Sequence, residues 1–381
     1  MGYQFDSPKA LENLNALAGT SLERVEDPDT LANYLARLPV TESSKLRHLM
    51  VQRLIRMKFL DRFRVNRAFL VAIDGTGWLT YHERHCEHCL TRTHDNVTVY
   101  YHPVLEAKLV TPDGLAISLA TEFIENPEGW TKQDCKQDCE SKAFHRLVER
   151  LKKSFPKMSI CLLLDGLYAQ QPVLDRCAEY DWHYFITFKE GSMPARFEEY
   201  ERLKALQPAN RLQRDGDDDD DARQEFAWIN GLPIGPHQAN VLECREVRAN
   251  GDAKKFVWLT DFALDQHNAA SLAQRVGRQR WKIENQGFNI QKNHGYNLEH
   301  AYSEHEQAAK NFYVLLQIAH MIMQLLENGS LLPDVVQAFG SKRALSHRLL
   351  ECLRNNLLPS DALDLAATAA IQIRLRDSDS G

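Results

Sequence analysis

The sequence predicts an α/β layer fold with a mixed sheet flanked by helices. Short continuous apolar runs at 69–73 and 160–164 are typical of strands that are buried on both faces. Segments with helical spacing of apolar residues, such as 143–151 and 173–180, follow these strands. Strands that alternate with helices in this order form layered α/β domains.

Length and composition are those of a globular protein with two or three structural units. The chain has 381 residues, of which 44% are hydrophobic and 26% are charged. The polar start of the chain predicts no signal peptide. The longest apolar stretch, 312–326, is broken by polar residues and is too short to cross a bilayer. With eight cysteines and no secretion signal, we expect a cytoplasmic protein with reduced thiols and no membrane partner.

Residues 1–66 are predicted to be a helical region and a candidate for DNA binding. Apolar residues recur at helical spacing within 31–60. The segment 45–67 holds eight Lys and Arg against one acid, Asp61, and is either a solvated helix face or a phosphate-binding surface. The net charge of −6 does not exclude nucleic acid, because the six aspartates in the acidic run 215–221 account for it.

Residues 67–190 are expected to contain the first part of the sheet. Apolar runs predict strands at 69–73, 160–164 and 184–188, and a hairpin spans 104–121 around a Pro-Asp-Gly turn.

Residues 191–255 have a different pattern. Short alternating runs predict antiparallel strands around the acidic run 215–221. That run lacks the ligand spacing of a calcium loop, so we expect a solvated loop.

The sheet resumes in residues 256–300. A buried strand is predicted at 256–260 and a long helix at 267–292. Residues 301–381 are predicted to be a helical region that ends in a disordered tail at 376–381.

Two aspartates and one glutamate occupy positions that suit a metal site. Asp74 and Asp165 each follow a buried apolar run directly, and Glu284 lies on the predicted long helix. If the two strands are neighbours, the acids at their ends converge, and Mg²⁺ or Mn²⁺ prefers such oxygen ligands. Two such ions can activate water and stabilise the leaving oxygen of a phosphoryl displacement. The alternative is chance, because the chain has 52 acids and Asp-Gly is an ordinary turn.

The residues around Glu284 favour the metal site. Glu284 is the only acid between Ser271 and Lys292, and Arg280 precedes it by one helical turn. Cations beside a metal-binding carboxylate can hold a phosphate backbone, and an aromatic ring there either packs in the core or stacks on an unpaired base. The candidate DNA-binding residues are Arg275, Arg278, Arg280, Trp281 and Lys292.

Residues 69–306 resemble a DDE transposase of a bacterial insertion sequence, in the subgroup with an RNase H-like core and a β-rich insertion between the second Asp and the Glu. The resemblance is carried by Ile73-Asp-Gly-Thr76, Leu164-Asp-Gly-Leu-Tyr168, Arg280-Trp-Lys-Ile-Glu-Asn285 and Gly295-Tyr-Asn-Leu-Glu-His300.

The resemblance implies an RNase H-like mixed sheet and a catalytic triad of Asp74, Asp165 and Glu284 that binds Mg²⁺ or Mn²⁺. It also implies that Arg280 holds a DNA phosphate. Residues 67–190 and 256–300 would be the two parts of the catalytic core, and 191–255 the insertion. The implied partners are double-stranded DNA of the element ends and target and a second copy of the chain on that DNA, in a bacterial cytoplasm and on its nucleoid.

Two positions depart from the pattern of the family. A Tyr often lies three residues before the Arg, and here the residue is Gly277. A Lys often lies seven residues after the Glu, and here Gln291 occupies that position and Lys292 follows. These departures weaken the assignment of Lys292 and of a hairpin intermediate in end processing.

A second cluster of residues could bind zinc. Cys86-x-x-Cys89 is one half of a zinc knuckle, and Cys139 with a His could complete the ligand set. The alternative is a polar loop with free thiols. Three further cysteines in apolar runs are expected to be packing residues: Cys161, Cys177 and Cys244.

The sequence therefore predicts a metal-dependent DNA transposase that hydrolyses phosphodiester bonds at transposon ends and transfers the freed 3′-hydroxyl to target DNA. One alternative is a non-catalytic DNA-binding relic of the same fold, but a relic would be expected to lose one of the three acids, and all are present. The other is a hydrolytic nuclease or resolvase, which would lack the strand-transfer step.

Overall fold

The computed structural model describes residues 7–131, 136–214, 223–248, 251–330, 338, 342–362, 364, 368 and 372–375. The acidic run 215–221 and the tail 376–381 lie outside the described residues. The chain forms two compact units. One consists of Met1–Arg62 together with Asn293–Gly381, and the other consists of Phe63–Lys292.

The second unit is built on a mixed sheet, which has ten strands within the described residues. The strand order is β2-β3-β1-β5-β6-β10-β9-β8-β7, and β4 pairs with β3. The pairs β1–β5 and β5–β6 are parallel, whereas the others are antiparallel. The strands are β1 (Phe69–Tyr81), β2 (Leu90–His94), β3 (Val97–Val110), β4 (Ala116–Phe123), β5 (Ile160–Leu164), β6 (His183–Thr187), β7 (Arg211–Arg214), β8 (Arg223–Ile234), β9 (His237–Val247) and β10 (Ala253–Thr260).

Helices pack against this sheet, which gives the α/β, RNase H-like fold that the sequence predicts. The helix α5 buries Phe144, Leu147 and Leu151 and contacts β3 and β4. These contacts bury the apolar stripe that predicted the helix. The helical segments are α5 (Glu140–Ser154), η2 (Gly166–Tyr168), α6 (Gln171–Tyr180), α7 (Pro194–Leu206), α8 (Ala269–Arg275), η3 (Gly277–Gln279), the π-helix η4 (Ile283–Phe288) and α9 (Asn289–Asn293).

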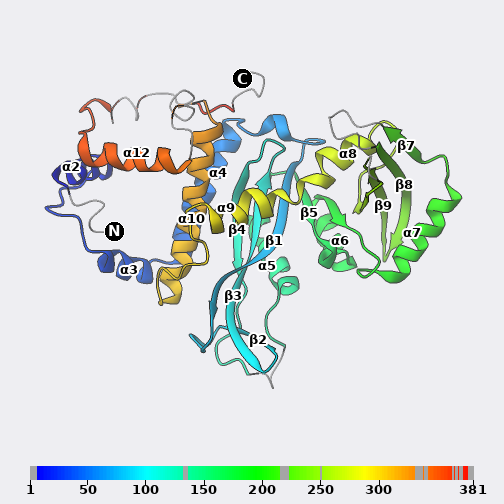
Figure 1. Ribbon diagram of the computed structural model, residues 1–381, viewed down its shortest axis with the longest axis horizontal. Helices are drawn as coiled ribbons and strands as arrows, with labels where there is room; N and C mark the ends of the chain where they lie inside the picture. The colour runs from blue at the N-terminus through cyan, green and yellow to red at the C-terminus, as the bar shows by residue number, and fades with distance from the viewer. Residues whose placement is uncertain are drawn as a thin grey trace. The chain divides into compact units, whose positions relative to one another are not determined.

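The predicted strands and the hairpin are present, and one boundary differs in a way that matters for the site. The strand β1 does not end at Ile73 but continues through Asp74 to Tyr81 beside β3 (Figure 1). Asp74 pairs with Glu106 of β3, so Gly75 lies within the strand and not in a turn. The strand predicted at 69–73 is therefore too short, because pairing with β3 continues after pairing with β5 has ended.

Two further findings concern the predicted insertion and the long helix. The strands β7, β8 and β9 extend the main sheet through β10. The segment 267–292 is not one regular helix, but is divided among α8, η3, η4 and α9.

Within its described residues, the first unit is mainly helical. The long helix α10 contacts α3 and α4, and α12 contacts α2. The Asn311 amide of α10 donates hydrogen bonds to the carbonyls of Leu35 in α3 and of Leu38, the residue that caps α3, and these bonds fix the packing. Among the described residues, no helix has the length and apolar character needed to cross a membrane. The helices are α2 (Pro8–Ala18), α3 (Pro28–Arg37), α4 (Val40–Arg56), α10 (Glu306–Asn328) and α12 (Lys342–Asn355), and the short turn η1 (Asp61–Phe63) follows α4.

Candidate active site

Strand register places the two aspartates beside each other. Parallel pairing of β1 with β5 ends at Ala72 and Leu163, and Asp74 of β1 and Asp165, which follows β5, each lie two residues further along the chain. Neighbouring strands are about 4.8 Å apart, so equivalent positions stay close where pairing ends. The chain then turns into η2, and the Asp165 carboxylate accepts a hydrogen bond from the backbone N–H of Leu167 at 2.9 Å.

Arg280 links Glu284 to this pair. One guanidinium nitrogen of Arg280 lies 3.3 Å from Asp74 Oδ2, and the other lies 2.5 Å from Glu284 Oε1. Glu284 belongs to the π-helix η4, which contacts β1, β3 and β4. The residues 74, 165, 280 and 284 therefore gather at one place on the sheet. Within the described residues, however, the three acids do not form a group with all ligand oxygens within 4.8 Å of one another.

The local charge distribution suits a divalent cation. The pKa of Asp74 is raised to about 7, mainly by burial and also by the negative charges of Glu284 and Asp165, against the lowering effect of Arg280. The Asp74 side chain is only 19% exposed, whereas the Glu284 side chain is 48% exposed. The neighbouring acids raise this pKa because their negative charges repel the ionised Asp74 carboxylate. A divalent cation bound among the three acids would offset this repulsion and favour the ionised form. The donor set of carboxylate oxygens fits Mg²⁺ or Mn²⁺.

A fourth acid, Glu140, lies at the same place and was not found by sequence reasoning. Its carboxylate lies so close to Gly75 that a Cβ at position 75 would collide with it. Burial raises the pKa of Glu140, and the charge of Asp165 raises it further. Burial followed by the charges of Glu140, Asp165 and Asp74 also raises the pKa of Tyr168. Glu140 is the first residue of α5 and belongs to no sequence motif. Gly75 was the one sequence signal that another side chain could approach β1 at this position.

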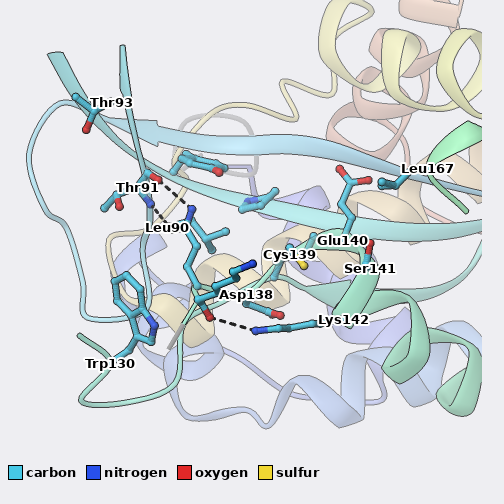
Figure 2. A pocket seen from close by; sticks show the side chains of 15 residues that line it. Leu90, Thr91, Thr93, Trp130, Asp138, Cys139, Glu140, Ser141, Lys142 and Leu167 are labelled. Carbon is cyan, nitrogen blue, oxygen red and sulfur yellow. Dashed lines mark hydrogen bonds between the residues drawn. The ribbon is translucent and has the colours of Figure 1, made fainter. Parts of the chain in front are cut away.

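A groove of about 770 Å³ is lined by Glu140, whereas Asp74, Asp165 and Glu284 are not among its lining residues. Figure 2 shows Glu140 and Leu167 together at one end of it, and Leu167 is two residues from Asp165. Leu90 and Thr91 of β2 line the other part. The groove therefore extends from β2 to Glu140.

The candidate DNA-binding residues differ in their surroundings. Arg275 is exposed, and Trp281 is 40% exposed with Lys282 Nζ 4.7 Å from its ring centre. Arg278 stacks on the ring of Phe256 at 4.1 Å and pairs with Glu246 at 3.3 Å, which gives it a structural role. The exposure of Trp281 shows that it is not a core residue.

The two departures from the family pattern have physical reasons. Gly277 lies against the indole of Trp258, where a Cβ would be 2.7 Å from the ring, so a tyrosine has no room. Gln291 is fully buried, whereas Lys292 is half-buried. The wider i→i+5 turns of η4 rotate the chain less per residue than α-helical turns do. An angle for Lys292 drawn from a regular α-helix therefore does not apply.

The predicted zinc ligands are brought together only in part. Cys86 and Cys89 lie side by side, and the third donor beside them is His102 of β3. Cys139 is exposed at the start of α5, lines the groove and is not part of this group. The three predicted packing cysteines are buried, as expected: Cys161, Cys177 and Cys244.

Comparison with protein families gives one finding. Residues 133–322, about half of the chain, match the family model described as the transposase DDE domain. The matched segment contains Asp165, Arg280 and Glu284, and it begins after Asp74. A search of curated proteins found no match.

Proposed function

Because the chain belongs to the DDE transposases, we propose that it cuts DNA at transposon ends in a Mg²⁺- or Mn²⁺-dependent reaction and joins the freed 3′-hydroxyl to target DNA. The observation that supports the proposal is the register of β1 and β5, which ends two residues before Asp74 and Asp165, together with the Arg280 contacts to Asp74 and Glu284.

In this proposal Asp74, Asp165 and Glu284 hold the metal ions. When bound, the ions supply an activated water and stabilise the leaving oxygen. Asp74 must be ionised to act as a ligand, and its pKa of about 7 means that the proton leaves near neutral pH. Glu140 is a further acid beside Asp165 and Gly75, and in this proposal it supports the acidic cluster without a place in the triad.

Arg280 pairs with two carboxylates that a metal cation would bind in its place. Its guanidinium now neutralises Asp74 and Glu284. Once cations neutralise these acids, the same guanidinium can bind a DNA phosphate through paired N–H donors. Exposed Arg275 and Trp281 lie on the same segment and would contact the backbone and an unpaired base, and Lys292 is a further candidate. Two DNA ends are brought together by two copies of the chain in this proposal.

Replacement of the triad tests the proposal. Asp74→Asn, Asp165→Asn and Glu284→Gln should each reduce Mg²⁺-dependent nicking of end DNA by about 10³-fold or more, because each removes a metal ligand. Binding of the same DNA, measured by fluorescence anisotropy in Ca²⁺, should change less than about threefold. Nicking at the wild-type rate in any of the three variants would refute the assignment.

Two glutamates of α5 provide a graded arm and a matched control. Glu140→Gln should reduce nicking by about 10–100-fold, as expected for a group that supports metal ligands. Glu149 is exposed on the same helix, so Glu149→Gln should leave the nicking rate unchanged. A joining assay with pre-cut ends distinguishes a transposase from a hydrolytic nuclease, which would cut without joining.

A further inference from the structure

Two thiols of the β1–β2 connection and one imidazole of β3 converge. Cys86 Sγ lies 3.4 Å from Cys89 Sγ, and His102 Nε2 lies 3.4 Å and 3.2 Å from the two sulfurs. Among the described residues, this is the group of three metal-ligating side chains whose donor atoms all lie within 4.8 Å of one another. It is separate from the acidic cluster, and the proposed function does not use it.

We propose that Cys86, Cys89 and His102 bind a zinc ion. Zn–S bonds of about 2.3 Å and Zn–N bonds of about 2.0 Å in a tetrahedron require S···S and S···N distances of roughly 3.8 and 3.5 Å. The observed distances are shorter by only a few tenths of an ångström, so small side-chain shifts admit the ion. The fourth position is left to a water molecule, as at zinc sites with three protein ligands.

The surroundings are those of a preformed metal site. Cys89 and His102 are buried, with 3% and 4% of their surfaces exposed. His102 lies on β3 opposite Leu79 of β1, so a rigid sheet positions its ring. Its other nitrogen, Nδ1, faces Glu125 Oε1 at 4.0 Å. This distance is longer than a hydrogen bond, but a carboxylate on that side of the ring is the usual partner of a metal-bound imidazole.

A disulfide does not explain the cluster. The sulfurs are 3.4 Å apart, whereas a disulfide requires about 2.05 Å, and both cysteines are free. Two thiolates with an imidazole are a soft donor set that selects zinc over Mg²⁺. The site therefore takes a different metal from the acidic cluster.

Zinc at this position would fix one wall of the groove in Figure 2. Asn126 binds the loop through its side-chain N–H to the Cys89 carbonyl at 2.9 Å, and its side-chain oxygen accepts from the Asp138 N–H at 3.1 Å. Leu90, the next residue after Cys89, and Asp138 both line the groove. The ion thus holds the β1–β2 connection to β3 at the side from which the groove approaches Glu140.

Metal analysis of the full-length protein tests the site. Wild-type protein purified under reducing conditions and reconstituted with zinc should retain about one zinc per chain after desalting, by inductively coupled plasma mass spectrometry. Cys86→Ser, Cys89→Ser and His102→Ala should each lose most of it. The matched control, Cys139→Ser, removes a thiol outside the group and should retain the metal.

A second measurement does not depend on the folding of the variants. Titration of zinc-free wild-type protein with Co²⁺ should give the visible absorption of a tetrahedral thiolate site, and Zn²⁺ should abolish it. Asp74→Asn should show the same absorption, so failure of the catalytic proposal would not affect this result. An octahedral Co²⁺ spectrum, or equal zinc content in wild type and a Cys86→Ser/Cys89→Ser variant, would overturn the proposal.

Discussion

Asp74 shows how a single residue is tuned by its position in the sheet. It lies in the middle of β1, where burial removes water from its carboxylate and two acids repel its negative charge. These effects raise its pKa to about 7 from an ordinary value of 3.8, and Arg280 offsets them only in part. The folded state therefore resists ionisation of a group that the proposed metal binding requires in its ionised form.

The raised pKa predicts a pH-dependent gain of stability in Asp74→Asn. A group whose pKa is higher in the folded than in the unfolded state contributes stability at low pH that is lost as pH rises through the folded value. Wild-type protein should thus lose stability between about pH 4 and pH 7, and asparagine avoids this loss. In EDTA, the variant should gain roughly 1–2 kcal/mol relative to wild type between pH 5 and pH 8, by urea denaturation.

Magnesium provides the control for this prediction. At pH 8 Mg²⁺ should stabilise the wild type more than the variant, because a ligand stabilises the state that binds it. A stability difference that stays constant from pH 5 to pH 8 would contradict the raised pKa.

At the scale of elements, the broken helical segment places Glu284 on the sheet. Gly277 allows η3 to contact Trp258, and Gly287 allows η4 to approach the stem of Lys108, where a Cβ would lie 3.1 Å away. Lys108 is fully buried on β3 and its Nζ lies 5.6 Å from the ring centre of Phe288. The π-helical turns between these contacts are the type often found at functional sites.

Gly277→Ala tests this close packing. The new methyl group would overlap the Trp258 ring, so the segment must move, at a cost of about 1–3 kcal/mol in the free energy of unfolding. Displacement of Glu284 should also lower the rate of Mg²⁺-dependent nicking by about tenfold or more, since misplacement by about an ångström can cost 10²-fold. Gly191→Ala has open space around its Cβ and should change stability by less than about 0.5 kcal/mol. Equal stabilities for the two variants would argue against tight packing at Gly277.

At the scale of the whole molecule, net charge is a poor guide to the DNA-binding surface. The chain carries a net charge of −6, and the segment 45–67 is nevertheless rich in cations. Some of these cationic side chains are buried and others are exposed. Arg47 is only 1% exposed, whereas three cations on α4 are exposed: Lys45, Arg53 and Arg56. Only the exposed side chains can contact phosphates, and they form the candidate DNA-binding face of α4.

Alanine at Lys45, Arg53 and Arg56 together should weaken DNA binding and reduce its salt dependence. Each lost phosphate contact lowers the slope of log K against log salt by about 0.9, so the slope should fall by nearly 3. Fluorescence anisotropy with end DNA at several salt concentrations measures this slope. Two exposed lysines serve as the control: Lys153 in the last turn of α5 and Lys157 just after that helix. Alanine at both positions should leave the slope unchanged. An unchanged slope in the triple variant would remove α4 as the binding face.

The sequence by itself determined the class of fold and the three acids of the proposed triad. Buried apolar runs identified the central strands, because a strand that is covered on both faces is apolar along its whole length. Asp74 and Asp165 could be chosen because each follows such a run, and Glu284 because its segment is otherwise basic. These signals are local, and local patterns can be read along a chain.

Only the tertiary structure decided which distant residues meet. The register that sets Asp74 opposite Asp165, the approach of Glu140 to Gly75 and the choice of His102 over Cys139 each depend on strand pairing and packing. A strand histidine or a glutamate at the start of a helix looks ordinary in sequence. Its chemistry arises from neighbours far along the chain, and hydrophobic periodicity carries no information about which neighbours those are.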